Sequence, residues 1–266
     1  MGADTKALRT RIKSVRSTMH LTKAMGLVAS SKIRRANEAM HKAADYAGAL
    51  SDMTEVLLRC PECAKSPYLR QTGDRTRLIV IAGDRGLAGG YNANVFRLVR
   101  EYPAAELLPI GKRACDRFGK PFVSSETFSG EDAHTWAKTL CADFAAGDYD
   151  RLGIVYTRYV SMMTQEAAVQ WVLPLTRPEG GKTVSTLFEP DEATVLETAV
   201  PAYVAGVIAA AVRESFASEV AARRVAMDAA GKNATAMIDD LQLRYNRARQ
   251  SAITQEITEI VAGSGA

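Results

Sequence analysis

The first sixty residues carry apolar side chains at alternating intervals of four and three positions. Counted from Leu8 in this way, twelve of fifteen positions are apolar, where the composition would give about seven by chance. No proline interrupts residues 1–60. The pattern predicts one continuous helix of about 75 Å with a heptad seam. The seam positions are Leu8, Ile12, Val15, Met19, Thr22, Gly26, Ala29, Ile33, Ala36, Met40, Ala43, Ala47, Leu50, Thr54 and Leu57.

The other end of the chain has a similar pattern. No proline follows Pro201, and good helix formers dominate from there to the glycines of the last four residues. Spacing of three and four predicts a second long seam, with Arg223 in its one gap and Ile253, Ile257, Ile260 and Val261 in the last turns. The seam positions are Val220, Met227, Ala230, Ala234, Met237, Leu241, Tyr245, Ala248 and Ala252.

A single long helix cannot bury its own seam, whereas two such helices can bury theirs against each other. The many Ala and Gly positions in the first seam allow close approach. We therefore expect residues 1–58 and 201–266 to form an antiparallel coiled coil, with residues 59–74 and 191–200 as connectors. The alternative is a bundle helix folded back on a globular core, which the length of the seam disfavours.

The middle of the chain has a different pattern, in which short apolar runs alternate with helical periodicity. This alternation predicts a small, mostly parallel sheet in a Rossmann-like, doubly wound α/β domain over residues 75–190. The fold class is thus α/β with a long coiled coil. The expected strands are residues 77–82, 106–111, 151–160 and 166–175, the expected helices are 92–102, 112–119 and 131–146, and residues 176–186 are an expected loop.

Charge is concentrated at one end of the chain. The formal net charge is +4, yet residues 1–35 contain nine Lys and Arg residues against a single acid, Asp4. From Arg213 onward, seven basic and seven acidic residues cancel. The first helix should therefore seek an acidic partner. We expect no membrane span, because no apolar run approaches about 20 residues, and no signal peptide, because residues 1–14 lack an apolar core.

A glycine-rich stretch, GDRGLAGGYN, follows the first expected strand at residues 83–92. A turn between a strand and a helix can hold a phosphate on backbone N–H groups. The glycine spacing matches neither GxGxxG nor GxxxxGK[ST], and no Lys, Ser or Thr follows Gly90. Anion binding through Arg85 and the helix N-terminus stays open, but the residues favour a tight structural or contact turn.

Residues with catalytic potential do not converge in the sequence. His20, His41 and His134 are scattered, and no paired-carboxylate, HExxH or GxSxG motif occurs. Asp148 and Asp150 flank a turn and are expected to be solvated. The single CPEC motif, Cys60 and Cys63, is a weak sign of a metal site or regulatory disulfide, and loop cysteines without an essential role are favoured. Cys115 and Cys141 are isolated in the sequence. We expect no catalytic residue, cofactor or metal.

Three stretches of the sequence resemble the gamma subunits of F-type ATP synthases. The first is RIKSVRSTMHLTKAMGLVASSKIRRA, residues 11–36, and the second is the GDRGLAGGYN turn, which is similar to the family's SDRGLCGG-type loop. The third comprises FEPDEATVLETAVPAYV and the last 49 residues from Ser218. The resemblance spans essentially the whole chain, and its C-terminal part is the most specific.

The resemblance implies a non-catalytic rotor shaft. In this family the coiled coil turns inside a ring of alternating alpha and beta subunits, driven by proton or sodium ion flow, and its foot docks on the membrane c-ring with the epsilon subunit. The asymmetry of the shaft forces the beta sites through different nucleotide affinities. The chain would then be a peripheral membrane protein, indirectly attached through the c-ring. Its place would be the cytoplasmic face of a bacterial plasma membrane, or the matrix or stromal side of an organellar one.

The resemblance also implies which residues contact other subunits. The basic first helix and the turn would face an acidic helix-turn-helix of the beta subunit, and the second helix would face other beta loops, with an apolar tip acting as a bearing. Exposed charge pairs each contribute only about 0–1 kcal/mol of stabilisation, which suits contacts that are repeatedly made and broken. The implied beta contacts are Arg9, Lys13, Arg16, Lys23, Met25, Arg85, Ala88, Arg223, Arg249, Gln250, Thr254 and Glu256, and the bearing tip is Ile253, Ile257 and Ile260.

The sequence departs from the family pattern at a few positions. Gly83 and Ala88 stand where Ser and Cys are common, and Arg224 adds a charge where Met is usual. Three rivals remain on sequence grounds: a basic-zipper-like nucleic-acid binder, a nucleotide-dependent enzyme and a simple coiled-coil tether. Zipper proteins place the basic region before the heptads, whereas here both occupy the same turns, so no nucleic-acid partner is expected. Arg223 and Arg249 could also be ordinary solvated charges.

Overall fold

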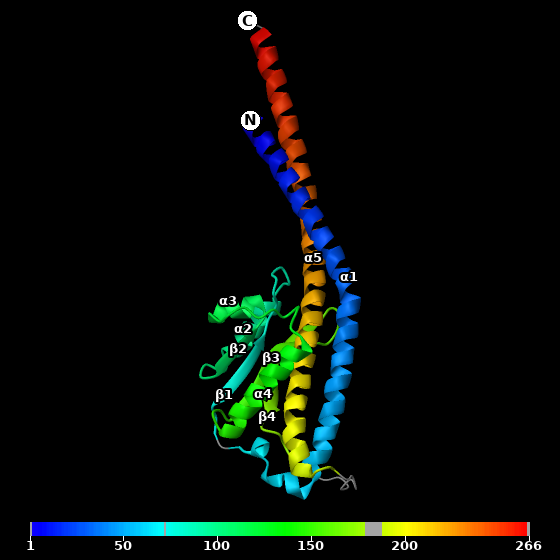
Figure 1. Cartoon of the computed structure of the whole chain (residues 1–266). Coiled ribbons are helices and arrows are strands. Elements are labelled where there is room, and N and C mark those ends of the chain that lie inside the picture. Colours follow the sequence, from blue (N-terminus) through cyan, green and yellow to red (C-terminus); the bar gives the residue numbers. More distant parts are fainter. Residues whose placement is uncertain (1, 72, 179–187, 265–266) are drawn as a thin grey trace. The chain divides into compact units, whose positions relative to one another are not determined.

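The computed structural model describes residues 2–71, 73–178 and 188–264. Its elements are α1 (Gly2–Arg59), the short 3₁₀ helices η1 (Pro61–Lys65) and η2 (Pro67–Leu69), β1 (Thr76–Ile81), α2 (Tyr91–Val99), β2 (Glu106–Ile110), α3 (Lys112–Phe118), α4 (Gly130–Ala146), β3 (Arg151–Tyr159), β4 (Gln165–Leu173) and α5 (Glu192–Ser264) (Figure 1). The chain divides into two compact units, Ser30–Arg223 and Met1–Ala29 with Arg224–Ala266. Each is described by itself.

The larger unit, Ser30–Arg223, is built on a four-stranded sheet with the strand order β2-β1-β3-β4. β1 pairs in parallel with both β2 and β3, whereas β4 runs antiparallel to β3. The expected strands and helices of residues 75–175 are confirmed, with shifts of a few residues at their ends. The expected loop at 176–186 is described only as far as residue 178, and its remainder lies outside the described residues.

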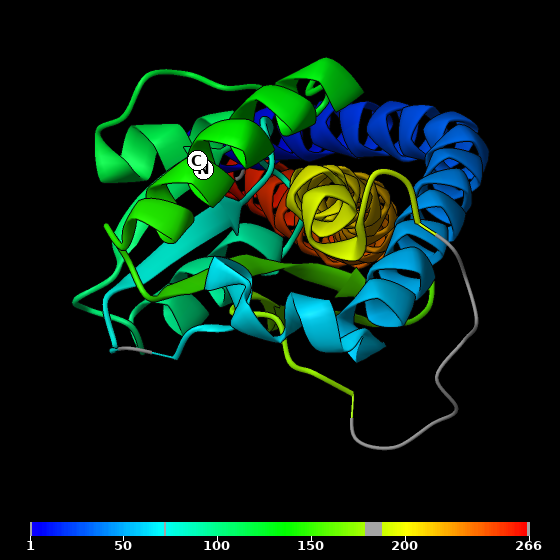
Figure 2. The same cartoon turned by 60° about the horizontal axis from the view of Figure 1, so that its bottom comes forward.

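The two faces of the sheet bury different side chains of the same strand. Ile79 and Ile81 of β1 lie in a core with α4, the end of α1 and the first part of α5. Leu78 and Val80 face the opposite way and pack with α2 and α3. The alternation of side chains along a strand therefore places one helical layer on each face, as in a doubly wound fold (Figure 2).

Helix α5 begins earlier than the sequence pattern predicted. Residues 192–200, expected as part of a connector, are helical, and Pro201 lies inside α5. The start is fixed by Asp191, whose carboxylate accepts hydrogen bonds from the Thr194 N–H at 2.9 Å and the Thr194 hydroxyl at 2.8 Å. This N-cap satisfies a free donor of the first turn, and apolar packing of Leu196 and Val200 outweighs the bond lost at the proline.

The apolar part of α5 is also longer than expected. The helix contains an 18-residue window with a mean hydropathy of 1.8, long and apolar enough by composition to cross a membrane, although 56% of that window is buried inside the protein. The expectation that no apolar run approaches this length was therefore wrong. Within the larger unit this segment packs against α1, and Gly206 leaves the room that the Leu50 side chain occupies.

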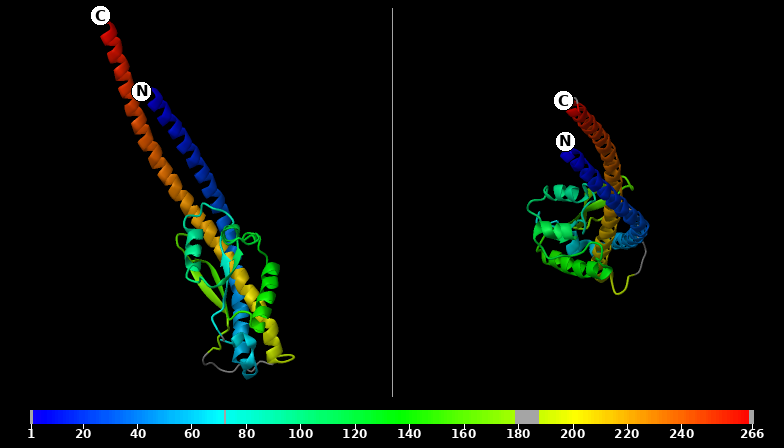
Figure 3. Two further views of the ribbon diagram at one scale, coloured as in Figure 1. Left: turned by 90° about the vertical axis from the view of Figure 1, so that its left-hand side faces the viewer. Right: turned by 90° about the horizontal axis from the view of Figure 1, so that it is seen from above.

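The smaller unit consists of two antiparallel helical segments, α1 as far as Ala29 and α5 from Arg224 on (Figure 3). Thr22 of α1 faces Gly231 of α5, and Met19 Sδ lies 3.6 Å from the Thr235 hydroxyl. Pairing of lower with higher residue numbers is the register of an antiparallel coiled coil, so that expectation is confirmed.

The seams are largely as predicted. Every seam position of α1 from Leu8 to Leu57 is at least half-buried. On α5, however, Met237 is 46% exposed and Ile238 is buried at 7% exposure. The seam continues from Met227 to Gly231, Ala234, Ile238 and Leu241 in steps of four and three. The predicted position Met237 was therefore wrong by one residue, whereas the predicted position Ala230 is half-buried, as is its neighbour Gly231.

Candidate partner-contact site

The turn after β1 has a defined backbone conformation. The Gly83 N–H donates to Asn92 Oδ1 at 2.9 Å, and the Arg113 N–H donates to the Gly83 carbonyl at 3.1 Å. Leu87 has a positive φ of 62°, which is uncommon for a residue with a side chain, and Gly89 follows with 57°. These bonds hold the turn in a conformation that points Leu87 outward, with 63% of its surface exposed.

Asp84 ties the turn to the loop that precedes α4. Its carboxylate accepts hydrogen bonds from the backbone N–H groups of Lys112, Ser125 and Glu126 at 2.9–3.1 Å and from the Ser124 hydroxyl at 2.6 Å. Burial alone would raise the pKa of this carboxyl, but its hydrogen bonds outweigh burial and lower the pKa below its ordinary value. Asp84 is therefore ionised and holds two loops together.

Helix α5 also binds the backbone of this turn. The Arg223 guanidinium donates to the Gly86 carbonyl at 3.3 Å and forms a salt bridge with Glu219. Glu219 is 3% exposed, and burial raises the pKa of its carboxyl above the ordinary value although Arg223 lowers it in part. Arg223, expected as a partner contact, is only 13% exposed in its side chain and instead fixes the turn.

The exposed side of the turn carries one predicted contact and one that the sequence did not indicate. Arg85 has a side chain 67% exposed, with Glu126 at 3.6 Å, whereas Ala88 is 2% exposed. The structure therefore buries the expected contact Ala88 and presents its neighbour Leu87. Only the positive φ of Leu87 brings this residue outward, and no sequence motif signals that φ.

The question of phosphate binding at the turn has a structural answer. A Cβ atom placed on Gly83 would lie 2.6–2.9 Å from the Glu219 carboxyl group, so this carboxylate sits directly against the turn backbone. A second anion at the same place would be repelled by it. The geometry thus disfavours a phosphate here, and the glycine admits the carboxylate of the chain's own helix.

In the smaller unit, the predicted basic contacts of α1 share one face. They follow one another at intervals of four, three and seven, and all are exposed: Arg9, Lys13, Arg16 and Lys23. Within the described residues none of the four forms a salt bridge. His20 continues the same line. We call these five residues the basic stripe; Met25, the fifth predicted contact on α1, is half-buried beside it.

The predicted contacts of α5 gather near the last turns. Arg249, Gln250, Thr254 and Glu256 are all exposed. The bearing residues Ile253, Ile257 and Ile260 are 46%, 56% and 70% exposed. Thr5 of α1 lines a hollow together with Tyr245, Ala252 and Glu259. The end of α5 extends past the beginning of α1 (Figure 1), and Ile257 and Ile260 are the more exposed of the three isoleucines.

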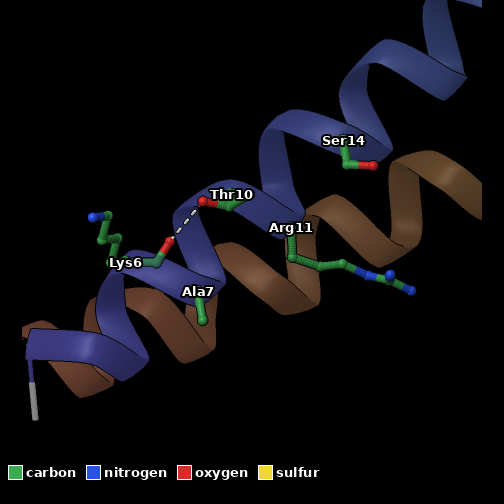
Figure 4. Close-up of a pocket in the computed structure, with 5 residues that line it drawn as sticks. All are labelled: Lys6, Ala7, Thr10, Arg11 and Ser14. Carbon is green, nitrogen blue, oxygen red and sulfur yellow. Dashed lines mark hydrogen bonds between the residues drawn. The ribbon is translucent and has the colours of Figure 1, made fainter.

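A further hollow on α1 has basic residues but no convergent site. It is lined by Lys6, Ala7, Thr10, Arg11 and Ser14. The Thr10 hydroxyl donates to the Lys6 carbonyl at 3.0 Å, and the charged ends of Lys6 and Arg11 point in different directions (Figure 4). Two diverging cations cannot clamp one anion, so this surface adds to the positive field of α1 rather than forming a pocket.

Titratable residues outside these surfaces have structural roles. Asp150, expected to be solvated, is 4% exposed and accepts hydrogen bonds from the Arg75 N–H and guanidinium at 3.0 Å, so that expectation was wrong. His20, His41 and His134 are exposed. Among the described residues, no group of three or more His, Cys, Asp or Glu side chains could hold a metal ion.

All four cysteines are buried, and three of them lie in helices. Cys63 belongs to η1, Cys60 directly follows α1, and Cys115 and Cys141 lie in α3 and α4; all four are buried and free. The Cys63 thiol donates to the Glu192 carbonyl at 3.5 Å, and burial raises its pKa to about 11. A thiol that stays protonated is a poor nucleophile and a poor metal ligand.

Comparison with known proteins matches this chain over its whole length. A family model described as ATP synthase covers residues 4–266. An ATP synthase gamma chain from Ruminococcus albus is 40% identical over 281 residues, which cover 98% of each chain. One from Xanthomonas campestris is 40% identical over 282 residues with the same coverage. The chain belongs to the ATP synthase gamma family.

Solved structures agree with this fold. A chain of the Euglena gracilis mitochondrial ATP synthase, in a structure of OSCP, F1 and c-ring, matches with a TM-score of 0.71 at 20% identity, covering 100% of this chain and 95% of that one. A chain in a structure of the rotor of the same synthase matches with a TM-score of 0.69 at 19% identity. The match covers 95% of this chain and 100% of that one. The combination of long paired helices and a mixed sheet is thus the fold of a gamma chain.

Arg224, which was expected to depart from the family pattern, lies beside a glycine of α1. A Cβ atom on Gly26 would lie 3.0 Å from the Arg224 guanidinium. Gly26 thus leaves room for the long side chain in the helix pair of the smaller unit. Arg224 also lowers the pKa of the Asp228 carboxyl, after the larger effect of Lys232. Asp228 is thus a nearby opposite charge on the same helix, and its carboxylate forms an ion pair with Lys232.

Proposed function

We propose that this gamma chain is the non-catalytic central rotor shaft of an F-type ATP synthase. It couples ion flow through a membrane c-ring to ATP synthesis or hydrolysis at beta-subunit sites by rotating inside an alpha/beta ring. The observation that carries the proposal is the smaller unit, which consists of two paired helices alone. Two helices packed along one seam resist twisting better than a single helix.

The surface of the helix pair fits this role. The basic stripe offers exposed cations that can meet acidic beta-subunit elements and release them again, because exposed ion pairs contribute only about 0–1 kcal/mol. Arg85 and Leu87 of the turn offer one charge and one apolar contact. Arg249, Gln250, Thr254 and Glu256 would meet other beta-subunit loops. Arg223 acts by holding the turn.

The partners and location follow from the same proposal. The chain would assemble with alpha and beta subunits, an epsilon subunit and a c-ring, and would bind neither nucleic acid nor a cofactor. The curated relatives quoted above are bacterial. We therefore favour a peripheral position on the cytoplasmic face of a bacterial plasma membrane, over the matrix or stromal side of an organellar membrane.

Reconstitution tests the proposal directly. The full chain is mixed with alpha and beta subunits of a relative, and rotation of a bead attached to the larger unit is recorded during ATP hydrolysis. We expect continuous rotation in one direction. Hydrolysis without rotation, or failure of the chain to join the ring, would contradict the shaft role. ATP hydrolysis by the chain on its own would instead favour an enzyme.

A matched pair of variants tests the basic stripe. Replacing Arg9 and Lys13 with Gln should reduce the salt dependence of association with the alpha/beta ring, because fewer charge pairs form. The control replaces Lys232 and Arg244 with Gln, since both are exposed cations of the opposite helix that already pair with Asp228 and Asp240. An equal effect of both variants would show that the stripe has no special role.

A further inference from the structure

The carboxyl ends of β1 and β3 are the place where an open α/β sheet usually binds its ligand. β1 has β2 on one side and β3 on the other, so the chain reverses its direction of progress through the sheet between β1 and β3. Loops from adjacent strands diverge at such a switch point and leave a crevice. In this protein that crevice is filled by polar side chains of α5.

These side chains bind the backbone at the end of β3. Ser215 Oγ accepts a hydrogen bond from the Thr157 N–H at 3.4 Å, and the Ser218 hydroxyl donates to the Thr157 carbonyl at 3.1 Å. A Glu214 carboxylate oxygen accepts from the Tyr159 N–H at 2.9 Å. Ser215 and Ser218 are fully buried. One face of α5 thus forms the kind of hydrogen bonds to the end of β3 that a bound ligand would form.

The same helix also binds the elements that follow β1. The Tyr91 hydroxyl, at the start of α2, bonds to the Ser215 carbonyl at 2.9 Å and lies 2.7 Å from its hydroxyl. Glu219 lies against Gly83 and accepts a hydrogen bond from the Arg85 N–H. This carboxylate occupies the place next to the glycine turn and helix N-terminus that a phosphate takes in nucleotide-binding sheets.

We propose that residues 214–223 of α5 are the built-in ligand of this crevice, and that Glu219, with Arg223, is the positioning residue that locks α5 to the sheet for transmission of torque. The torque role rests on the proposed function. Directional hydrogen bonds and a buried ion pair have one favourable geometry, so they oppose rotation of the helix about its own axis. Apolar contacts are non-directional and oppose it less.

The lock itself is tested on the isolated full chain by hydrogen exchange. Glu219→Ala removes the acceptor of the Arg85 N–H, and exchange in the segment around Arg85 should rise on the order of tenfold, as expected for one lost charge-assisted hydrogen bond. Asp228→Ala is the matched control, because it breaks an ion pair of the same spacing on α5 that is exposed to solvent. Unchanged exchange in Glu219→Ala would overturn the lock.

A milder variant protects the test against misfolding. Ser215→Ala keeps both charges and removes only the hydroxyl that contacts Tyr91 and the Thr157 N–H. Exchange at the end of β3 should then rise while exchange in α4 stays as in the parent chain. A uniform rise across the whole larger unit, or no rise at Thr157, would contradict specific binding of the crevice by α5.

The torque role is tested in the assembled synthase, in inverted membrane vesicles with equal amounts of complex. Glu219→Ala should lower proton pumping per ATP hydrolysed relative to the Asp228→Ala control. Glu219→Gln keeps an acceptor for the Arg85 N–H, so its ratio of protons pumped to ATP hydrolysed should lie between those of Glu219→Ala and the parent. Faster exchange with an unchanged pumping ratio would overturn the torque role alone. Parent complexes that hydrolyse ATP without rotation would overturn the proposed function and leave the lock intact.

Discussion

Two carboxylates of the larger unit, Asp84 and Glu219, hold the turn after β1 in place. Asp84 and Glu219 both contact the turn after β1 or anchor it to its neighbours, yet their pKa values move in opposite directions. Asp84 gains more from its hydrogen bonds than it loses through burial, whereas for Glu219 burial prevails. The GDRG motif indicated a turn and a contact, but a one-dimensional pattern could not indicate that Glu219, far along the chain, approaches Gly83.

Replacing Asp84 by Asn should destabilise the protein by about 1–3 kcal/mol at neutral pH, because the new side chain cannot accept all four hydrogen bonds. The folded pKa of Asp84 lies below the unfolded value, so its contribution is present above the unfolded pKa and is lost as the pH falls through the folded pKa. Urea unfolding at several pH values measures this effect. The difference between parent and Asp84→Asn should shrink toward acid pH. Asp228→Asn, an exposed control, should cost far less.

At the scale of elements, the pattern of apolar residues was enough to predict the long helices and the strands. It was not enough to predict every buried position of the α5 seam. Heptad spacing located α1 and its buried positions from Leu8 to Leu57. It gave the wrong residue at Met237, because positions one apart on a helix differ by about 100° and both neighbours are apolar. Tertiary packing on the partner helix selects Ile238. The sequence pattern placed the start of the second helix at Pro201, whereas the structure begins α5 at Glu192, directly after the Asp191 cap.

The capping role of Asp191 predicts a local effect. Asp191→Ala should cost about 1 kcal/mol, since the first turn of α5 loses the acceptor of the Thr194 N–H. Hydrogen exchange should quicken over residues 192–196 and stay unchanged beyond Pro201. Asp239→Ala, an exposed substitution in the middle of the same helix, serves as control. If α5 began at Pro201 in solution, residues 192–196 would already exchange rapidly in the parent chain.

At the scale of the whole molecule, function depends on which surfaces are left exposed. The sequence indicated the basic face of α1 because charge and seam follow the same heptads at adjacent positions. The resemblance to gamma subunits implied Arg223 and Ala88 as contacts as well, but within the larger unit the Arg223 side chain is 13% exposed and Ala88 is 2% exposed. A family motif marks residues that matter without distinguishing those that touch a partner from those that hold the touching residue in place. By their burial, Arg223 and Ala88 are suited to the second role.

The exposed isoleucines at the end of α5 allow the shaft role to be separated from folding. Ile257 and Ile260 are 56% and 70% exposed, so replacing both with Asp should change the stability of the isolated chain by less than about 0.5 kcal/mol for each site. In an assembled synthase the same change places two charges where an apolar bearing is proposed. We expect ATP-driven proton pumping to fall while thermal unfolding of the isolated chain is unchanged. Thr258→Asp, on the same turns, is the matched control for added charge. Equal pumping in all three proteins would show that the isoleucines do not form a bearing, because a surface free of contacts tolerates either substitution.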